Sequence, residues 1–205
     1  MPVEEIRFQR QLLVEGRTAV PFARALLRKL GHEANVQVQN FGSRNDFGGF
    51  LGAFVRMPGF GTVKSVGVLI DAEDEPAGTC RSVINNIAKA GLSASPDARE
   101  FSHGTPRVGF FVIPDESSSG MIETLCLRSV EDDPALACVD EYFLCLESKS
   151  IPQPRNINKA RTQAFLASRD RAGLLVGEAA HAGYWNWDHI SMLPLRQFLV
   201  NLATV

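Results

Sequence analysis

The chain has 205 residues, of which 45% are hydrophobic and 21% charged, and its formal net charge is −2. This size and composition are typical of one globular domain, or of one domain with a helical appendage. The charge balance excludes binding to nucleic acid through overall positive charge, so a polyanion would need a local basic patch or a metal ion. No stretch approaches the roughly 20 apolar residues of a membrane span, and we expect neither a membrane protein nor a signal peptide.

Four cysteines are present, and none of them forms a C-x-x-C pair. They are Cys80, Cys126, Cys138 and Cys145. This spacing favours free thiols in a reducing compartment over a disulfide framework or a zinc site. We therefore expect a cytoplasmic protein.

The first quarter of the chain predicts alternating strands and helices. An apolar run that ends at Glu15 predicts a strand, and the apolar face of 20–30, which ends before Gly31, predicts a helix. Alternation over 36–39 predicts a second strand with one face in contact with water. A polar, glycine-rich loop over 42–49 then leads into a helix that starts at Phe50.

The same alternation continues as far as Pro114. Apolar residues 66–71 predict a buried strand, 79–90 a helix and 108–113 another buried strand. Strands that alternate with helices indicate parallel pairing. The sequence therefore predicts an α/β fold, with a mainly parallel, Rossmann-like sheet flanked by helices.

Beyond Pro114 the pattern becomes helical. After a polar loop over 115–120, helices are predicted over 121–130, 134–146, 158–168 and 193–202. We interpret 1–205 as a single domain with an α/β part over about 8–130 and an α-rich C-terminal part over about 131–205. The segment 150–158, which contains two prolines, is the expected linker.

Acidic side chains end two of the predicted strands. Glu15 follows one apolar run and Asp71 the other, and Glu73 lies on the same side of an extended backbone as Asp71. Parallel strands bring their carboxyl ends to one edge of a sheet, where such folds bind ligands. Carboxylates held together there either bind a cation or acquire raised pKa values, and Mg²⁺ or Mn²⁺ suits their oxygen atoms. The alternative for each acid is a cap on the following helix.

The two acidic motifs together resemble the Toprim domain, the metal-binding fold of topoisomerases, primases and OLD-type nucleases. That domain has a Glu-Gly after its first strand and an Asp-x-Asp after a later one; here they read Leu-Val-Glu15-Gly16 and Asp71-Ala72-Glu73-Asp74. The chain is most similar to small stand-alone bacterial Toprim-like proteins related to the OLD-type nucleases. The resemblance implies that Glu15 is a metal ligand or the acid/base group, and that Asp71 and Glu73 are metal ligands. Toprim-type relatives often place a second acid where this chain has Ala19, which favours one bound ion over two.

Two later residues gain a role through the same resemblance. On the helical pattern alone, Glu123 is either a solvent-facing acid or a buried one that needs a partner. Toprim-like families carry a Gly-x-x-Glu at this place, which implies that Glu123 is a further metal ligand. Lys159 near a helix start is ordinarily exposed, but OLD-type nucleases bring a late lysine to the site, where it would neutralise charge in phosphoryl transfer. The match implies a catalytic Lys159, with Arg161 as the alternative.

The glycine-rich loop offers a candidate phosphate site. Its central residues are Ser43, Arg44 and Asn45. Backbone amides beside glycines approach phosphates closely, and arginine pairs with phosphate through two parallel hydrogen bonds. The alternative is a plain surface loop with a solvated arginine.

An aromatic cluster precedes the last predicted helix. Trp185 and Trp187 lie beside Tyr184. Such rings could stack on nucleic-acid bases, but they more often anchor a helical appendage to a core. We favour the anchor, because the resembling families carry a Gly-Trp/Tyr-x-x-Asp element before a last helix.

The favoured hypothesis is a nuclease that depends on Mg²⁺ or Mn²⁺ for phosphodiester cleavage or phosphoryl transfer on nucleic acid. The first alternative is a catalytically degenerate Toprim-like module that binds a partner ATPase or a nucleotide, and Ala19 favours it. The second is an unrelated α/β phosphatase- or receiver-like domain, which the absence of an Asp-x-Asp-x-Thr motif disfavours. The candidate partners are nucleic acid, an ATPase and a second copy of the chain.

Overall fold

A four-stranded parallel sheet forms the centre of the molecule. The computed structural model describes residues 3–204, and its strands are β1 (Arg10–Glu15), β2 (Gln37–Gly42), β3 (Ser65–Asp71) and β4 (Arg107–Ile113). They lie in the order β2-β1-β3-β4, and every neighbouring pair is parallel. The α/β fold predicted from the sequence is confirmed, and the sheet is Rossmann-like.

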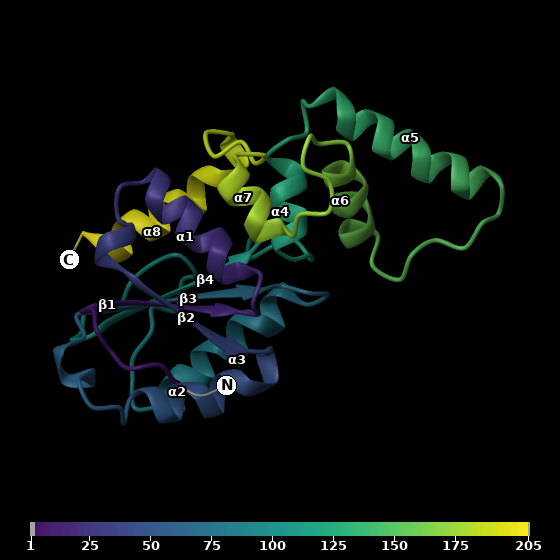
Figure 1. Cartoon of the computed structure of the whole chain (residues 1–205). Coiled ribbons are helices and arrows are strands. Elements are labelled where there is room, and N and C mark those ends of the chain that lie inside the picture. Colours follow the sequence, from purple (N-terminus) through teal and green to yellow (C-terminus); the bar gives the residue numbers. More distant parts are fainter. Residues whose placement is uncertain (1–2, 205) are drawn as a thin grey trace.

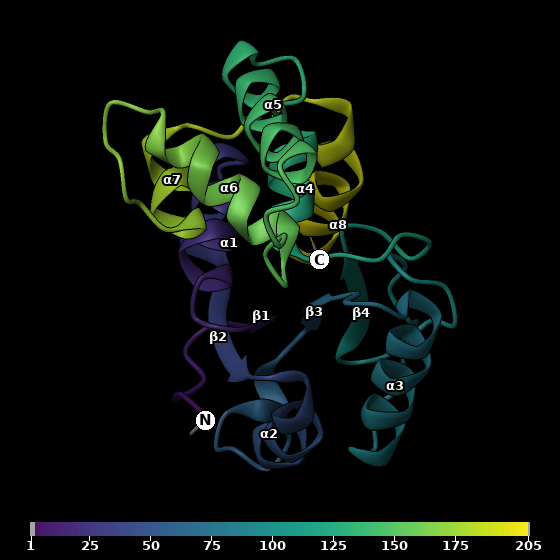
Figure 2. The same ribbon diagram turned by 90° about the vertical axis from the view of Figure 1, so that its right-hand side faces the viewer.

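Helices cover both faces of the sheet, because the strands are apolar on both sides. Side chains alternate between two cores, so that Leu12 and Val14 enter one and Leu13 the other. Figures 1 and 2 show which helices cover each face. The first core lies under α1 (Ala19–Lys29), α4 (Ile122–Arg128), α7 (Val176–Ala182) and α8 (Leu193–Ala203). The second lies under α2 (Phe47–Phe54) and α3 (Pro76–Lys89).

The C-terminal part is α-rich, as predicted, and it both leaves the sheet and returns to it. Helix α5 (Pro134–Ser148) extends away from the body with α6 (Ile157–Ala167) beside its base (Figure 1). Helix α8 then packs on the sheet, where the Ser65 hydroxyl donates to the Leu202 carbonyl at 2.9 Å. The apolar side chains of α8 belong to the same core as those of β1 and β3.

The two tryptophans anchor the C-terminal part. Trp185 is 2% exposed, stacks on Phe165 with ring centroids 5.8 Å apart, and donates from Nε1 to the Val176 carbonyl at 3.0 Å. Trp187 packs against Phe22 of α1 at 5.2 Å. The predicted anchor is confirmed, and burial removes these indole rings from any stacking with bases.

One face of β2 was expected to contact water, and this expectation is wrong. Gln37 and Gln39 are buried in a ladder of amides, in which Gln11 Nε2 donates to Gln37 Oε1 at 3.0 Å and Gln39 Nε2 donates to Gln11 Oε1 at 2.9 Å. Amides from the N-terminal segment complete the ladder, because Glu4 N and Arg7 N donate to Gln39 and Gln37. Satisfied hydrogen bonds are what allow polar side chains to be buried here.

Several element boundaries also differ from the prediction. The glycine-rich segment is not a loop throughout, because β2 runs to Gly42, a 3-10 turn spans Arg44–Asp46 and α2 begins at Phe47. The buried apolar face of α2 outweighs the low helix propensity of its glycines. Helix α3 begins at Pro76 instead of Thr79, and α7 was not predicted.

The cysteines behave as expected. All four are free thiols: Cys80, Cys126, Cys138 and Cys145. Over residues 3–204, none of the helices combines the length and apolar character needed to cross a membrane.

Candidate functional site

Glu15 ends β1 in a position fixed by backbone amides. The following Gly16 has a φ of +77°, a left-handed conformation that costs glycine little and turns the chain from the strand toward α1. Glu15 Oε1 accepts from Arg44 N at 2.8 Å, and Oε2 accepts from Asp71 N at 3.2 Å. The carboxylate of the first strand is therefore oriented by the segments that end the second and third strands.

Asp71 occupies the middle of the sheet edge. It ends β3 and lies opposite Ile113 of β4, while the preceding residues of β3 pair with β1. Its Oδ1 accepts from Ile122 N, at the start of α4, at 3.0 Å. Its carbonyl accepts from Arg44 Nη2 at 2.6 Å.

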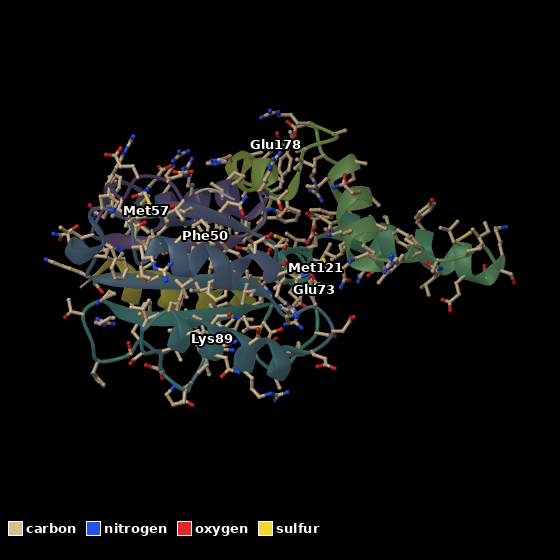
Figure 3. All side chains as sticks on the ribbon, turned by 90° about the horizontal axis from the view of Figure 1, so that it is seen from below. Phe50, Met57, Glu73, Lys89, Met121 and Glu178 are labelled. Atoms are coloured by element: carbon tan, nitrogen blue, oxygen red, sulfur yellow. The ribbon has the colours of Figure 1, made fainter. Side chains whose placement is uncertain are left out.

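Glu73 reaches the site through a strained backbone. Its φ is +54°, a left-handed value that costs a residue with a Cβ atom roughly 1–2 kcal/mol. Two backbone hydrogen bonds with Gly120, of 2.8 and 2.7 Å, hold it there. Figure 3 shows Glu73 next to Met121, where the helical part joins the α/β part. Stored strain of this kind concentrates at functional sites.

Glu123 and Lys159 come from two helices of the second half of the chain. Glu123 lies in the first turn of α4. Lys159 lies in the first turn of α6, where its backbone amide donates to the Asn156 side chain at 2.9 Å. Both side chains line the same pocket as the strand-end acids.

This acidic pocket has a volume of about 410 Å³ at the carboxyl edge of the sheet. The predicted convergence of the acids is confirmed, because Glu15, Asp71, Glu73 and Glu123 all line it together with Lys159. The polar lining residues that were not predicted from the sequence are Arg17, Thr18 and Asn40. Arg17 and Thr18 directly follow Glu15-Gly16, so the turn after the first strand was the signal that could have identified them.

The carboxylates that line the pocket affect one another's ionisation. Burial raises the pKa of Asp71 well above its usual value, and the charges of Glu15, Glu123 and Glu73 add to the effect. Burial likewise raises the pKa of Glu15, against the opposing hydrogen bonds from the Asp71 and Arg44 amides. Burial also raises the pKa of Glu123, although its backbone amide and the charge of Lys159 oppose this.

The donor atoms suit a hard cation, but they are not gathered into a finished site. Carboxylate oxygens are the ligands that Mg²⁺ and Mn²⁺ prefer. Within residues 3–204, however, no three His, Cys, Asp or Glu side chains are placed together so as to hold one ion. Backbone amides already occupy both oxygens of Glu15 and one oxygen of Asp71.

The predicted phosphate loop is only partly at the pocket. Ser43 borders it, and its hydroxyl donates to Asp46 Oδ2 at 2.6 Å. The Arg44 side chain turns inward to Asp71, and Asn45 is exposed outside the lining. The alternative cation Arg161 is directed elsewhere, because its Nε donates to Asp140 of α5 at 2.8 Å.

Comparison with known proteins adds a family but no activity. No curated protein and no solved structure matches the chain. Residues 9–204 match the family described as "Protein of unknown function (DUF3226)". Since this match extends over nearly the whole sequence, the chain is a member of the DUF3226 family.

Proposed function

We propose that the protein is a Toprim-like nuclease whose acidic pocket binds Mg²⁺ or Mn²⁺ and cleaves or transfers phosphodiesters of nucleic acid. The observation that carries the proposal is the half-buried Asp71 carboxylate, which lines one pocket with three other carboxylates at the carboxyl edge of a parallel sheet. Such an arrangement is unfavourable without a positive charge, and a bound cation offsets the repulsion. Free cysteines support a reducing, cytoplasmic location.

Each pocket residue has a role in this proposal. Asp71, Glu73 and Glu123 would hold the cation, which supplies charge stabilisation to a phosphate. Because Glu73 is exposed, its side chain can change rotamer to complete the ligand set. Glu15, fixed by two amides, would hold or move a proton at Oε1 or Oε2. Lys159 would contact the negatively charged substrate at the pocket rim.

A nicking assay tests this function. Supercoiled DNA and a single-stranded RNA are incubated with the protein and Mn²⁺ or Mg²⁺, and the products are followed on gels. We expect metal-dependent cleavage that Asp71→Asn reduces at least about 100-fold, as is usual when a group that stabilises the transition state is removed. The matched control Asp132→Asn makes the same chemical change at an exposed acid outside the pocket, and it should cleave like the wild type. Cleavage that survives in Asp71→Asn would reject the proposed site.

A second candidate function is a binding module without catalysis, for a partner ATPase or a nucleotide. Ala19 favours it, because this residue lines the pocket where the Toprim resemblance calls for an acid. The lack of a three-ligand set among the described residues is in accord with it. Calorimetry with ATP, with and without Mn²⁺, separates the two functions. Nucleotide binding by a protein that cleaves neither DNA nor RNA with either metal favours the module.

A further inference from the structure

Arg44 joins the two strand-end acids in a closed ring of hydrogen bonds. Its backbone amide donates to Glu15 Oε1 at 2.8 Å, and its side-chain Nη2 donates to the Asp71 carbonyl at 2.6 Å. The Asp71 amide closes the ring by donating to Glu15 Oε2 at 3.2 Å. We propose that Arg44 is a positioning residue for the acidic pocket, one that sets the Glu15 carboxylate against Asp71 and does not bind phosphate. This inference rests on the proposed function.

The turn that carries Arg44 is braced from both sides. The Ser43 hydroxyl and amide both donate to Asp46 Oδ2, at 2.6 and 2.8 Å, and this cap fixes the start of the 3-10 turn. Gly16 N donates to the Gly42 carbonyl at 2.8 Å, which ties the turn after β1 to the end of β2. The Arg44 amide is thus held in a fixed direction toward Glu15, and the ring links the ends of three strands.

The Arg44 guanidinium is engaged by the fold itself. Arg44 is not among the residues that line the pocket. Its Nε is buried, with no hydrogen-bond partner within residues 3–204, and Nη2 is engaged by the Asp71 carbonyl. Two parallel hydrogen bonds to a phosphate need two exposed guanidinium nitrogens on one edge. Nη2 belongs to both guanidinium edges that can pair with a phosphate in this way, and it already donates to the Asp71 carbonyl. The positioning role uses the side chain as it lies.

A substitution can remove the hydrogen bond from the Arg44 side chain and leave the hydrogen bond from its backbone amide in place. Arg44→Met keeps much of the aliphatic volume and the amide, but it loses the donor to the Asp71 carbonyl. Arg44→Lys restores a charged donor. The matched control is Arg196→Met, because the half-buried Arg196 also donates to a backbone carbonyl, that of Trp187 at 3.3 Å, and does not line the pocket. Circular dichroism checks that each variant folds. If Arg44→Met does not fold, Arg44→Lys is compared with the wild type in its place.

Three readouts separate positioning from phosphate binding: the Kd for Mn²⁺ by calorimetry, kcat and KM for cleavage, and the salt dependence of binding to a single-stranded oligonucleotide. We expect Arg44→Met to weaken Mn²⁺ binding and to lower kcat by about tenfold or more, as removal of a residue that orients metal ligands does. KM and the salt dependence of oligonucleotide binding should not change. Arg44→Lys should recover part of the lost Mn²⁺ affinity and part of the lost kcat, and Arg196→Met should match the wild type.

Two outcomes would overturn the positioning role. One is an Arg44→Met protein with unchanged Mn²⁺ affinity and kcat. The other is a raised KM together with a weaker salt dependence of oligonucleotide binding. A slope of log K against log salt concentration that is smaller in magnitude by about 0.7 is the signature of one lost contact to a single-stranded phosphate backbone. A wild type that binds Mn²⁺ but cleaves nothing rejects the nuclease function instead, and the Mn²⁺ affinities of the Arg44 variants then decide the positioning role.

Discussion

Asp71 has little freedom to relieve the repulsion around it. Its carboxylate is held by the Ile122 amide and lies at the end of a strand that has neighbours on both sides. Moving the side chain toward water would leave that amide without its acceptor. The pocket therefore keeps a carboxyl group whose ionisation its environment disfavours, which is the usual compromise between stability and function.

We predict that Asp71→Asn raises the stability of the protein in the absence of divalent cations. The amide side chain keeps an oxygen for the Ile122 amide and removes the repulsion from Glu15, Glu123 and Glu73. A gain of about 1 kcal/mol would raise Tm by roughly 2–4 °C in a chain of this size. Differential scanning calorimetry in EDTA measures the Tm of each variant. The control Asp132→Asn should have the Tm of the wild type.

The difference in stability between Asp71→Asn and the wild type depends on pH. Because the pKa of Asp71 is raised in the folded state, its ionisation destabilises the fold at neutral pH. This penalty is relieved as the pH falls through the folded-state pKa toward the ordinary carboxyl range near 4. The Tm advantage of Asp71→Asn should therefore shrink from pH 7 to pH 4. An advantage that grows over this range would contradict the raised pKa.

Some site residues were predictable from the sequence because their positions follow from local rules. An acid at the end of an apolar parallel strand must lie at the carboxyl edge, which is why Glu15 and Asp71 could be placed together. The inward contact of Arg44 and the pairing of Glu73 with Gly120 could not be predicted. Both depend on hydrogen bonds between loops that are distant in sequence, and such bonds leave no periodic pattern.

Elements were predictable to the extent that their own apolar pattern defines them. The buried strands and the longer amphipathic helices have such a pattern. Helix α7 has only 7 residues, including Gly177, and it is stabilised by packing on α1 instead of by its own sequence. The sequence predicted that one face of β2 contacts water. The hydrogen-bond partners that bury its glutamines come from the N-terminal segment and β1, so the residues of β2 alone do not reveal them.

At the level of elements, we predict that Gly177→Ala destabilises the contact between α7 and α1. A Cβ atom there would lie 2.3 Å from Pro21 Cγ and 2.6 Å from the Thr18 carbonyl oxygen, so one of the helices must shift. The expected loss is about 1–3 kcal/mol, typical of overpacking, measured by urea unfolding. The control is Gly52→Ala in α2, where an added Cβ meets nothing within 4 Å. It should gain about 0.5–1 kcal/mol from helix propensity. Equal changes in the free energy of unfolding for the two substitutions would contradict the close approach of α7 to α1 at Gly177.

Across the whole molecule, the helical part is held to the sheet by large aromatic anchors. Trp185 joins α6 and α7 through Phe165 and the Val176 carbonyl, and Trp187 joins the same region to α1. This attachment fixes the position of Lys159 on α6 relative to the acids on the sheet. Stability and the geometry of the pocket are therefore coupled.

We predict that Trp185→Ala lowers the free energy of unfolding by about 3–5 kcal/mol, the usual range for a buried aromatic side chain. The substitution removes the stacking on Phe165 and leaves the Val176 carbonyl without its donor. Urea unfolding followed by circular dichroism measures the change, and the exposed Tyr142→Ala on α5 is the control that should change it little. An unchanged free energy of unfolding would contradict the anchoring role of Trp185.

The most direct test of the cation site is calorimetric titration of the wild type with Mn²⁺, repeated with Asp71→Asn and with Asp132→Asn. We predict a Kd between about 1 µM and 1 mM for the wild type, the range of hard-cation sites with few carboxylates. We expect the same Kd for Asp132→Asn and no measurable binding for Asp71→Asn. A wild type that binds no Mn²⁺, or an Asp71→Asn variant that binds it as well as the wild type, would contradict the assignment of this pocket as a cation site.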